Sequence, residues 1–427
     1  MSHFELSMLQ TAGIGALALM IGMVLTRKVT FLQKFCVPSP VTGGLIFSLI
    51  TLALYAWFDI EVSFDRTLQD VFMVAFFTCV GYQCDLRVLK KGGKLLGLML
   101  LLLVLMIALQ NLMPWGITKL MHVDPLLGIA AGSVSMTGGH GTAAGFAGIL
   151  EGMGLQGAAT IGMAAATFGL IAGSMVGGPL ANRIIRTKLT NEQMQPKDAA
   201  IDPAMSGIES DEASPAGRTE RMSTNEQEFQ LYAKASYWIL MAMGGGTLLS
   251  WLLAKTGITF PTYFGALILA AILRNTIGLI PFKANDQRQA LSRNDQLLDM
   301  ERITSVGNIC LSMFLGMAMI SLRLWELQSL AVPLVVILAA QVVLMVLFVY
   351  FVAFPILGRT YDAAVLCAGL CGFGLGATPN AMANMSAVCY KYHYTAEPFL
   401  VVPILGAMFA DIINTGIISL FLRLLSI

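Results

Sequence analysis

The chain has 427 residues, of which 56% are hydrophobic and 12% are charged. Soluble domains carry about 25% charged residues, so this composition excludes an ordinary soluble protein and indicates one that lies in a membrane. The formal net charge of +1 excludes a strongly basic surface for nucleic acid and a strongly acidic surface for a basic partner.

Apolar runs long enough to cross a bilayer follow one another along the chain. A hydrocarbon layer of about 30 Å is crossed by about 20 apolar residues, and the runs predict five spanning helices in each half. Those of the first half cover 8–26, 41–58, 68–86, 95–117 and 157–183. Those of the second half cover 231–254, 261–280, 303–322, 330–353 and 397–422.

Basic residues between the spans gather on one side of the membrane, which predicts the orientation because Lys and Arg are enriched in cytoplasmic loops. The first run has no basic residue before it and is followed by Arg27 and Lys28, so we expect a retained helix that starts outside. Ten spans then place both termini outside. The cytoplasmic side receives Arg27, Lys28, Lys34, Arg87, Lys90, Lys91, Lys94, Arg183, Arg186, Lys188, Lys283, Arg288, Arg293 and Arg302.

The segment between the halves differs sharply in composition. Residues 186–230 contain 14 of the 51 charged residues, together with three prolines and several serines. Such a segment cannot bury enough apolar surface to fold alone. The prediction is an N-terminal membrane repeat over 1–185, a largely disordered cytoplasmic linker over 186–230, and a C-terminal membrane repeat over 231–427.

The two halves resemble each other in order and spacing. Gly43 has a counterpart in Gly265, Gln110 in Gln341, and Asp124 in Asp362, at an offset of about 222 to 238 residues. Because five spans is an odd number, the second unit enters the membrane from the opposite side. We therefore expect an all-α polytopic membrane protein of about ten helices in two inverted repeats, an arrangement typical of alternating access.

Each half also contains a stretch that is apolar enough for the membrane but too rich in glycine for a plain helix. These stretches are residues 132–142 and 369–380. Glycines and Pro379 weaken a helix and free backbone groups, which a bilayer tolerates only where they are buried in protein or line an aqueous cavity. The sequence therefore predicts a re-entrant loop in each half and a binding site where they lie.

The residue types in the loops suit a small anion and a hard cation. Half-helix N-termini offer unpaired amides and a partial positive charge to a carboxylate, and hydroxyl and amide side chains add donors. The substrate candidates in the loops are Ser135, Gly138, Gly139, His140, Gly141, Thr142, Gly374, Gly376, Thr378 and Asn380. Oxygens of Thr137, Thr142 and Thr378 are alternatively candidates for sodium. For His140, a structural hydrogen bond is at least as well supported as proton handling.

The last predicted helix carries Asp411 and Asn414, which are three residues apart and therefore on one helical face. An aspartate at membrane depth is rare and is taken as functional. Both residues are candidates for binding the substrate. Asp411 is a candidate for a substrate ammonium or a sodium ion, with an interfacial loop cap as the alternative. Asn182, Gln110 and Gln341 are weaker candidates, for which hydrogen bonding between helices is a sufficient explanation.

These residues resemble the bacterial glutamate:sodium symporter family, in Ser135–Thr142, in 361–365, in Cys371–Pro379 and in Leu324–Leu327. The resemblance covers both membrane halves. It implies sodium-driven uptake of L-glutamate with Na⁺ as coupling ion and no other cofactor, a homodimer in the bacterial inner membrane, and a substrate-carrying core that moves against a dimer scaffold in the manner of an elevator.

Three alternatives are kept beside this interpretation. The nearest is a sodium-coupled carrier of another small carboxylate, such as citrate, malate or 2-oxoglutarate, and a position of Asp411 near the loops would favour an amino acid instead. A channel is disfavoured by two dead-end loops and by spans without charged rings. An enzyme is disfavoured because the spans contain no Ser-His-Asp, paired-carboxylate or HExxH pattern.

Overall fold

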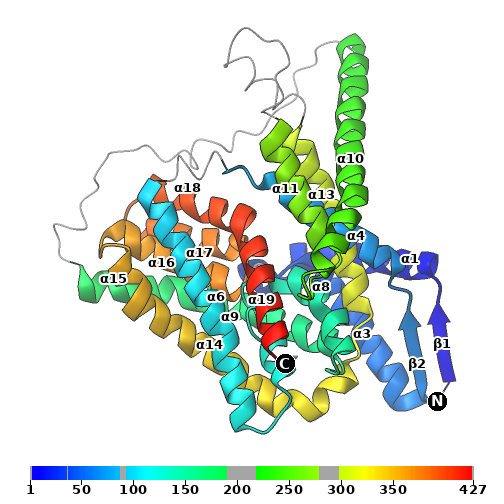
Figure 1. Ribbon diagram of the computed structural model, residues 1–427, viewed down its shortest axis with the longest axis horizontal. Coiled ribbons are helices and arrows are strands. Elements are labelled where there is room, and N and C mark those ends of the chain that lie inside the picture. Colours follow the sequence, from blue (N-terminus) through cyan, green and yellow to red (C-terminus); the bar gives the residue numbers. More distant parts are fainter. Residues whose placement is uncertain (1, 36, 87–92, 190–217, 278–297, 426–427) are drawn as a thin grey trace.

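A computed structural model describes residues 2–35, 37–86, 93–189, 218–277 and 298–425, and the chain is mostly helical (Figure 1). Seven of the described helices are long and apolar enough to cross a membrane. They are α1 (Met8–Lys28), α3 (Ser39–Phe58), α6 (Gly93–Leu120), α9 (Ala158–Lys188), the apolar part of α10 (Arg218–Ala254), α13 (Met300–Ile320) and α14 (Ala331–Phe348) with its continuation to Ile356. The protein is thus a multi-pass, mostly helical membrane protein.

The three other predicted spans are shorter or interrupted. Helix α4 covers Thr67–Gln83 and α11 covers Phe264–Thr276. The last span is divided into α18 (Ala396–Ile404), a π-helical turn (Leu405–Phe409) and α19 (Ala410–Leu425). A second π-helical turn, Val349–Ala353, joins α14 to α15 (Phe354–Ile356). A π-turn changes the pairing of backbone carbonyls, and such turns are frequent at functional sites.

The predicted linker, residues 186–230, lies mainly outside the described residues. Its first residues complete α9, and its last residues belong to α10, which begins at Arg218 rather than near residue 231. Six basic residues predicted on the cytoplasmic side also lie outside the described residues, namely Arg87, Lys90, Lys91, Lys283, Arg288 and Arg293.

A small parallel sheet marks one end of the helices. Strand β1 (Ser2–Leu6) precedes α1 and strand β2 (Ile60–Phe64) follows α3, with Phe4 paired to Val62. We call this the sheet end. The opposite end, where α9 finishes and α10 begins, is called the linker end, and Figure 1 shows the two ends on opposite sides of the molecule. The sequence analysis does not predict the sheet.

The helices form two groups that lie side by side in Figure 1. The six-helix group consists of α1, α3, α4, α10, α11 and α13, and the hairpin group consists of α6 to α9 and α14 to α19. The largest hydrophobic cluster draws its buried residues from the hairpin group alone. Two smaller clusters belong to the six-helix group, apart from Met163 of α9. Each group therefore has its own core.

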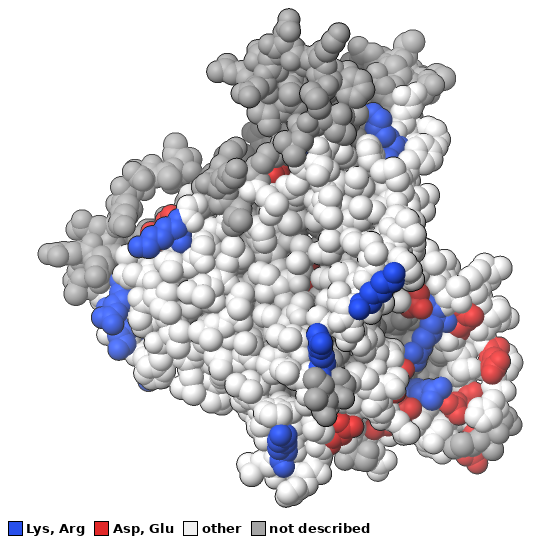
Figure 2. All heavy atoms as spheres, viewed as in Figure 1, with Lys and Arg blue, Asp and Glu red and all other residues white. Residues whose placement is uncertain are grey.

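Charged residues are absent from a broad part of the visible surface, as expected for a surface that contacts lipid. Figure 2 shows a broad uncharged surface, with most of the visible acidic residues on the side of the two strands. Large apolar side chains are exposed along the spans, including Leu17, Leu49, Leu240 and Val335. In a membrane such residues face lipid or a partner helix rather than water.

Candidate functional site

Two broken helices form the centre of the hairpin group. The first comprises α7 (Pro125–Ala130), an irregular turn over 131–138, and α8 (Gly139–Gly152). The second comprises α16 (Tyr361–Leu375), the two residues Gly376 and Ala377, and α17 (Thr378–Lys391). We call them the first and the second hairpin. They coincide with the two predicted glycine-rich segments.

Both hairpins begin with a capped helix and break where glycine accumulates. The Asp124 carboxylate accepts the Leu126 amide at 2.8 Å, and the Thr360 hydroxyl accepts the Ala363 amide at 3.2 Å. Each bond satisfies one of the donors that a helix start leaves unpaired. Gly139 has a φ of 60°, which a residue with a side chain adopts only at a cost. Pro379 near the start of α17 fits a new helix rather than a continued one.

The tips of the hairpins approach each other. A Cβ atom placed on Gly139 would lie 3.5 Å from the Gly376 carbonyl oxygen. Helix α9 passes beside the second tip so closely that a Cβ on Gly169 would lie 2.2 Å from the Leu375 carbonyl oxygen. The structure therefore brings the predicted loop residues of both halves to one place, beside α9.

Two buried glutamines connect the hairpins to the spanning helices. Gln110 of α6 donates to the Gly374 carbonyl at 2.6 Å and accepts the Thr137 hydroxyl at 2.6 Å, so it bridges both hairpins. Gln341 of α14 donates to the Gln110 carbonyl at 2.9 Å and to the Ala131 carbonyl at 3.3 Å. The hydrogen bonds expected of these residues are present, and they hold the irregular backbone in place.

Four asparagines make a second set of buried bonds. Asn380 and Asn384 of α17 donate to the α9 carbonyls of Leu170 at 2.8 Å and Gly173 at 2.9 Å. Asn111 donates to the Ser133 hydroxyl at 2.7 Å, and Asn414 donates to the Ser133 carbonyl at 3.0 Å. Asn111, Asn384 and Ser133 are not among the predicted site residues. Asn111 is a polar residue inside an apolar span, which is the signal that identifies it, whereas Asn384 lies outside the predicted spans.

Several predicted site residues are committed to structural bonds. Ser135 donates to the carbonyls of Ala130 at 2.5 Å and Gly162 at 3.0 Å. His140 is buried, and its Nε2 lies 3.0 Å from the Thr167 hydroxyl, which itself donates to the Met163 carbonyl. Because that hydroxyl donates elsewhere, it accepts from the Nε2–H of His140. The bond is the structural one expected for His140.

Other buried oxygens near the hairpins have no hydrogen-bond partner among the described residues. They are Thr142 Oγ1, Asn380 Oδ1, Asn414 Oδ1 and Gln341 Oε1. A buried polar atom without a partner costs about 1–3 kcal/mol. Such atoms are the ones expected to bind a ligand.

Asp411 lies near the middle of the last span, just after the π-turn. It is half-buried, and no described residue forms a hydrogen bond or ion pair with it. Within the next turn, Asn414 reaches the first hairpin and the Thr415 hydroxyl lies 3.3 Å from the Tyr263 hydroxyl. Within the preceding π-turn, Gly406 lies against the Thr378 hydroxyl. Asp411 is therefore on a helix that contacts both hairpins.

The four predicted sodium candidates are not joined to one another. No hydrogen bond links any two of Thr137, Thr142, Thr378 and Asp411 among the described residues. Thr137 bonds to Gln110, and the Thr378 hydroxyl lies against Gly406. Groups of three or more His, Cys, Asp or Glu that would suit a transition metal are absent from the described part of the chain. Oxygen ligands from hydroxyls and carbonyls suit a hard cation instead.

Aromatic residues of the six-helix group form a wall against the first hairpin. The ring of Tyr263 stacks on Phe77 with centroids 3.7 Å apart, and it packs against Gly145 of α8. Gly141 faces Phe76 and Phe77. The small residues of α8 thus form a surface without protruding side chains where it contacts the aromatic residues of the six-helix group.

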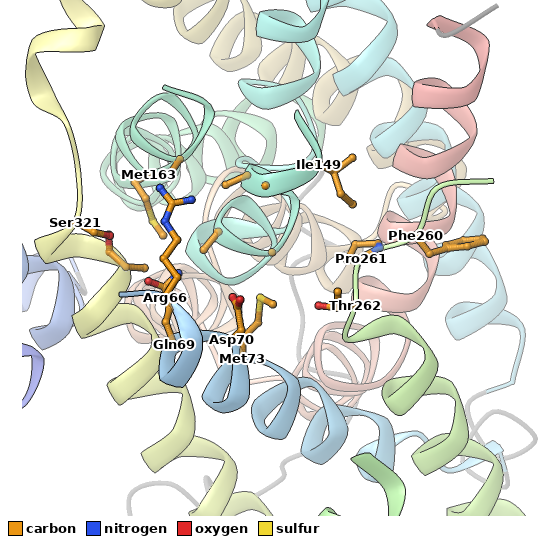
Figure 3. A pocket seen from close by; sticks show the side chains of 16 residues that line it. Arg66, Gln69, Asp70, Met73, Ile149, Met163, Phe260, Pro261, Thr262 and Ser321 are labelled. Carbon is orange, nitrogen blue, oxygen red and sulfur yellow. The ribbon is translucent and has the colours of Figure 1, made fainter. Parts of the chain in front are cut away.

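A pocket of about 260 Å³ opens at the same boundary (Figure 3). Gln69, Asp70 and Met73 come from α4, Gly145 and Ile149 from α8, Met163 from α9, and 260–262 from the segment before α11; Arg66, Ala144, Ala147, Gly148, Ala159, Ala318 and Ser321 complete the lining. Ligand pockets typically measure about 300–1,000 Å³ for drug-sized molecules, so this one suits a smaller solute. It connects the sheet end with the wall of Tyr263.

Ion pairs join the two helix groups at the sheet end. Arg66 lies 3.2 Å from Glu151 at the end of α8, and Arg323 lies 3.3 Å from Glu61 and 3.5 Å from Glu326. The backbone amide of Arg323 also donates to the Thr160 hydroxyl of α9 at 3.1 Å. Burial raises the pKa of Glu326, and the neighbouring Arg323 guanidinium opposes that shift.

Two broken helices that meet at their tips, inside one of two helix groups with separate cores, are typical of a secondary transporter. The family model described as sodium/glutamate symporter matches residues 4–394. The sodium/glutamate symporter of Escherichia coli K12 is 37% identical over 422 residues, which is 99% of this chain and 98% of the relative. That of Haemophilus influenzae is 34% identical over 428 residues and 99% of each chain. The chain belongs to the sodium/glutamate symporter family.

Proposed function

We infer that this protein is a sodium-coupled symporter that carries L-glutamate across the membrane. The observation that carries the inference is its similarity over nearly the whole chain to two proteins named sodium/glutamate symporters. The buried polar atoms at the meeting point of two broken helices supply a place for such a substrate. The alternative substrates citrate and malate have no comparable support.

We propose that the architecture is two inverted repeats of five spans, each with a re-entrant hairpin. The first hairpin supports this. Asp124, before the start of α7, and Glu151, near the end of α8, both lie toward the sheet end, where Glu151 forms an ion pair with Arg66. At the linker end, Lys391 of α17 donates to Asn182 of α9 at 3.1 Å. Each hairpin would thus enter and leave the membrane on one side, and the two would enter from opposite sides.

The proposed substrate site lies between the hairpin tips. The backbone amides at the starts of α8 and α17, those of Gly139, His140, Gly141, Thr378 and Asn380, would bind the two carboxylates, as helix N-termini do for anions. The oxygens of Thr142 and Asn380, buried without partners, would accept or orient the ligand. Asp411 would bind the ammonium group. Gly138, Gly374 and Gly376 would allow close approach of the backbone, while Ser135 and His140 would hold the first tip in shape.

The sodium site that we propose from the sequence uses oxygens of Thr137, Thr142, Thr378 and Asp411. Their positions in or beside the two tips support a shared role, because closure of the tips around a ligand would bring oxygens of both hairpins together. Coupling then follows: the ion would neutralise part of the substrate's charge and stabilise the closed arrangement.

Transport is proposed to occur by movement of the hairpin group against the six-helix group. Separate hydrophobic cores and the smooth contact of α8 with Tyr263 support this elevator motion. The six-helix group would form the scaffold of a homodimer, since apolar side chains remain exposed along α1, α3 and α10. In a bacterial inner membrane, the sheet end and both termini would lie outside, because Lys94, Arg183, Arg186 and Arg274 lie toward the linker end.

Uptake of labelled L-glutamate into proteoliposomes tests the function directly. Under an inward sodium gradient we expect uptake that is lost in potassium and reduced at least a hundredfold by Asp411→Asn, because the amide cannot neutralise an ammonium group. Thr378→Ala should reduce uptake less. Uptake that is independent of sodium would refute the coupling, and sodium-driven uptake of citrate without glutamate would refute the substrate.

A further inference from the structure

The two buried glutamines occupy equivalent places in the two halves but differ in one bond. Gln110 uses both ends of its amide, since Nε2 donates to Gly374 and Oε1 accepts from Thr137. Gln341 donates from Nε2 to two carbonyls, and its Oε1 has no partner among the described residues. At the offset of 238 residues that relates Asp124 to Asp362, the counterpart of Thr137 is Leu375, which has no hydroxyl.

The direction of the Gln341 oxygen is determined by these bonds. Both neighbours of the amide nitrogen are carbonyl oxygens, so exchanging nitrogen and oxygen would place three oxygens together without a proton. The side chain is fully buried, which excludes bulk water as a partner for Oε1. A buried carbonyl oxygen that is fixed in place and unpaired is suited to a cation.

Asn414 repeats this arrangement on the same short segment. Its amide nitrogen donates to the Ser133 carbonyl, its side chain is fully buried, and its Oδ1 has no partner. Gln341 and Asn414 therefore attach to carbonyls two residues apart in the irregular turn of the first hairpin. Neither residue lines the pocket at the boundary of the two helix groups. A bare ion fits such enclosed surroundings, whereas an amino acid does not.

We propose that Gln341 Oε1 and Asn414 Oδ1 are ligands of a sodium ion bound beside the Ala131–Ser133 segment, behind the first hairpin. This inference rests on the sodium-coupled transport proposed above, and it adds a site apart from the hairpin tips. Oxygens of amide side chains and irregular backbone are the ligands that transporters use for sodium. An ion there would fix the turn before the substrate binds, because the turn is what the two amides hold.

Binding of sodium alone to the purified full-length protein tests the site. The dissociation constant is measured with radioactive sodium and by the sodium-dependent rise in melting temperature, at constant ionic strength in choline and without glutamate. We expect Gln341→Met to raise the dissociation constant at least tenfold. Asn414→Leu, which removes the other proposed ligand, should raise it similarly, whereas the melting temperature without sodium reports any general loosening of the fold separately.

Asn275→Leu is the control, since it removes an amide of α11 whose oxygen accepts the Leu86 amide and whose nitrogen donates to the Cys84 carbonyl, away from both hairpins. It should leave the dissociation constant for sodium within about threefold. Equal losses in Gln341→Met and Asn275→Leu, or no loss in Gln341→Met, would overturn the site. Wild-type protein that shows no sodium-driven uptake would instead overturn the proposed function, so the two failures are distinguishable.

Discussion

The two hairpins are held in place by different kinds of contact. The first has an irregular turn over 131–138, held by amide side chains from α6, α14 and α19. The second changes direction within Gly376 and Ala377 and is held against α9 by Asn380 and Asn384 of its own helix. The first hairpin thus receives amide bonds from three helices, whereas the second receives one, from Gln110 of α6, and is otherwise held by its own asparagines and by close packing against α9.

The largest effect is expected where the second hairpin packs against α9. Gly169→Ala would place a Cβ 2.2 Å from the Leu375 carbonyl oxygen, which is a backbone atom and cannot move away alone. Overpacking of this kind costs about 1–3 kcal/mol, and we expect a value near the upper end, with loss of uptake. Melting temperature in detergent and uptake in proteoliposomes measure the two effects.

Gly178→Ala is the control on the same helix, because no atom lies within 4 Å of a Cβ placed there. Alanine favours a helix over glycine by about 1 kcal/mol, so stability should be unchanged or slightly higher. Equal losses of stability and uptake in both variants would contradict a specific contact between Gly169 and the second hairpin.

Removing one amide that holds each hairpin sharpens the comparison. Asn384→Ala removes one of the two asparagine bonds between the second hairpin and α9, whereas Asn111→Ala removes one of several amide bonds that hold the first hairpin. We expect a loss of about 2 kcal/mol and a tenfold fall in uptake for Asn384→Ala, and about half that loss in free energy for Asn111→Ala. A larger effect of Asn111→Ala would reverse the proposed order.

The base of the second hairpin is expected to respond to pH. His393 stacks on Tyr361 with centroids 3.8 Å apart, and burial lowers the pKa of His393, although Asp362 opposes this. A histidine whose pKa is lower in the folded state contributes stability that is present at neutral pH and is lost as pH falls through and below its ordinary value, about 6.5. Melting temperature should therefore fall more steeply between pH 7 and 5 than in His393→Phe. Parallel curves for the two proteins would contradict this.

The sequence predicts much of this fold because membrane helices are defined by length and apolar composition. The spans and both glycine-rich segments lie within a few residues of their predicted positions, apart from the start of α10 and the short α11. The division into two helix groups is not predicted, since helices that are apolar on all sides carry no periodic signal for their packing. The π-turns and the pairing of β1 with β2 depend on contacts between distant segments, as do the partners of Asn384 and Tyr263.

The smallest effect is expected at the ion pair that joins the first hairpin to the six-helix group. Arg66 and Glu151 are both partly exposed, and exposed pairs contribute about 0.2–1 kcal/mol. A double-mutant cycle of Arg66→Gln and Glu151→Gln should give a coupling energy in that range, which decreases as salt screens the charges. The effect on uptake is expected in the rate rather than in the affinity for glutamate, because the pair spans the boundary across which the hairpin group is proposed to move. A change in affinity alone would contradict this, and would point to the boundary pocket, which Arg66 also lines.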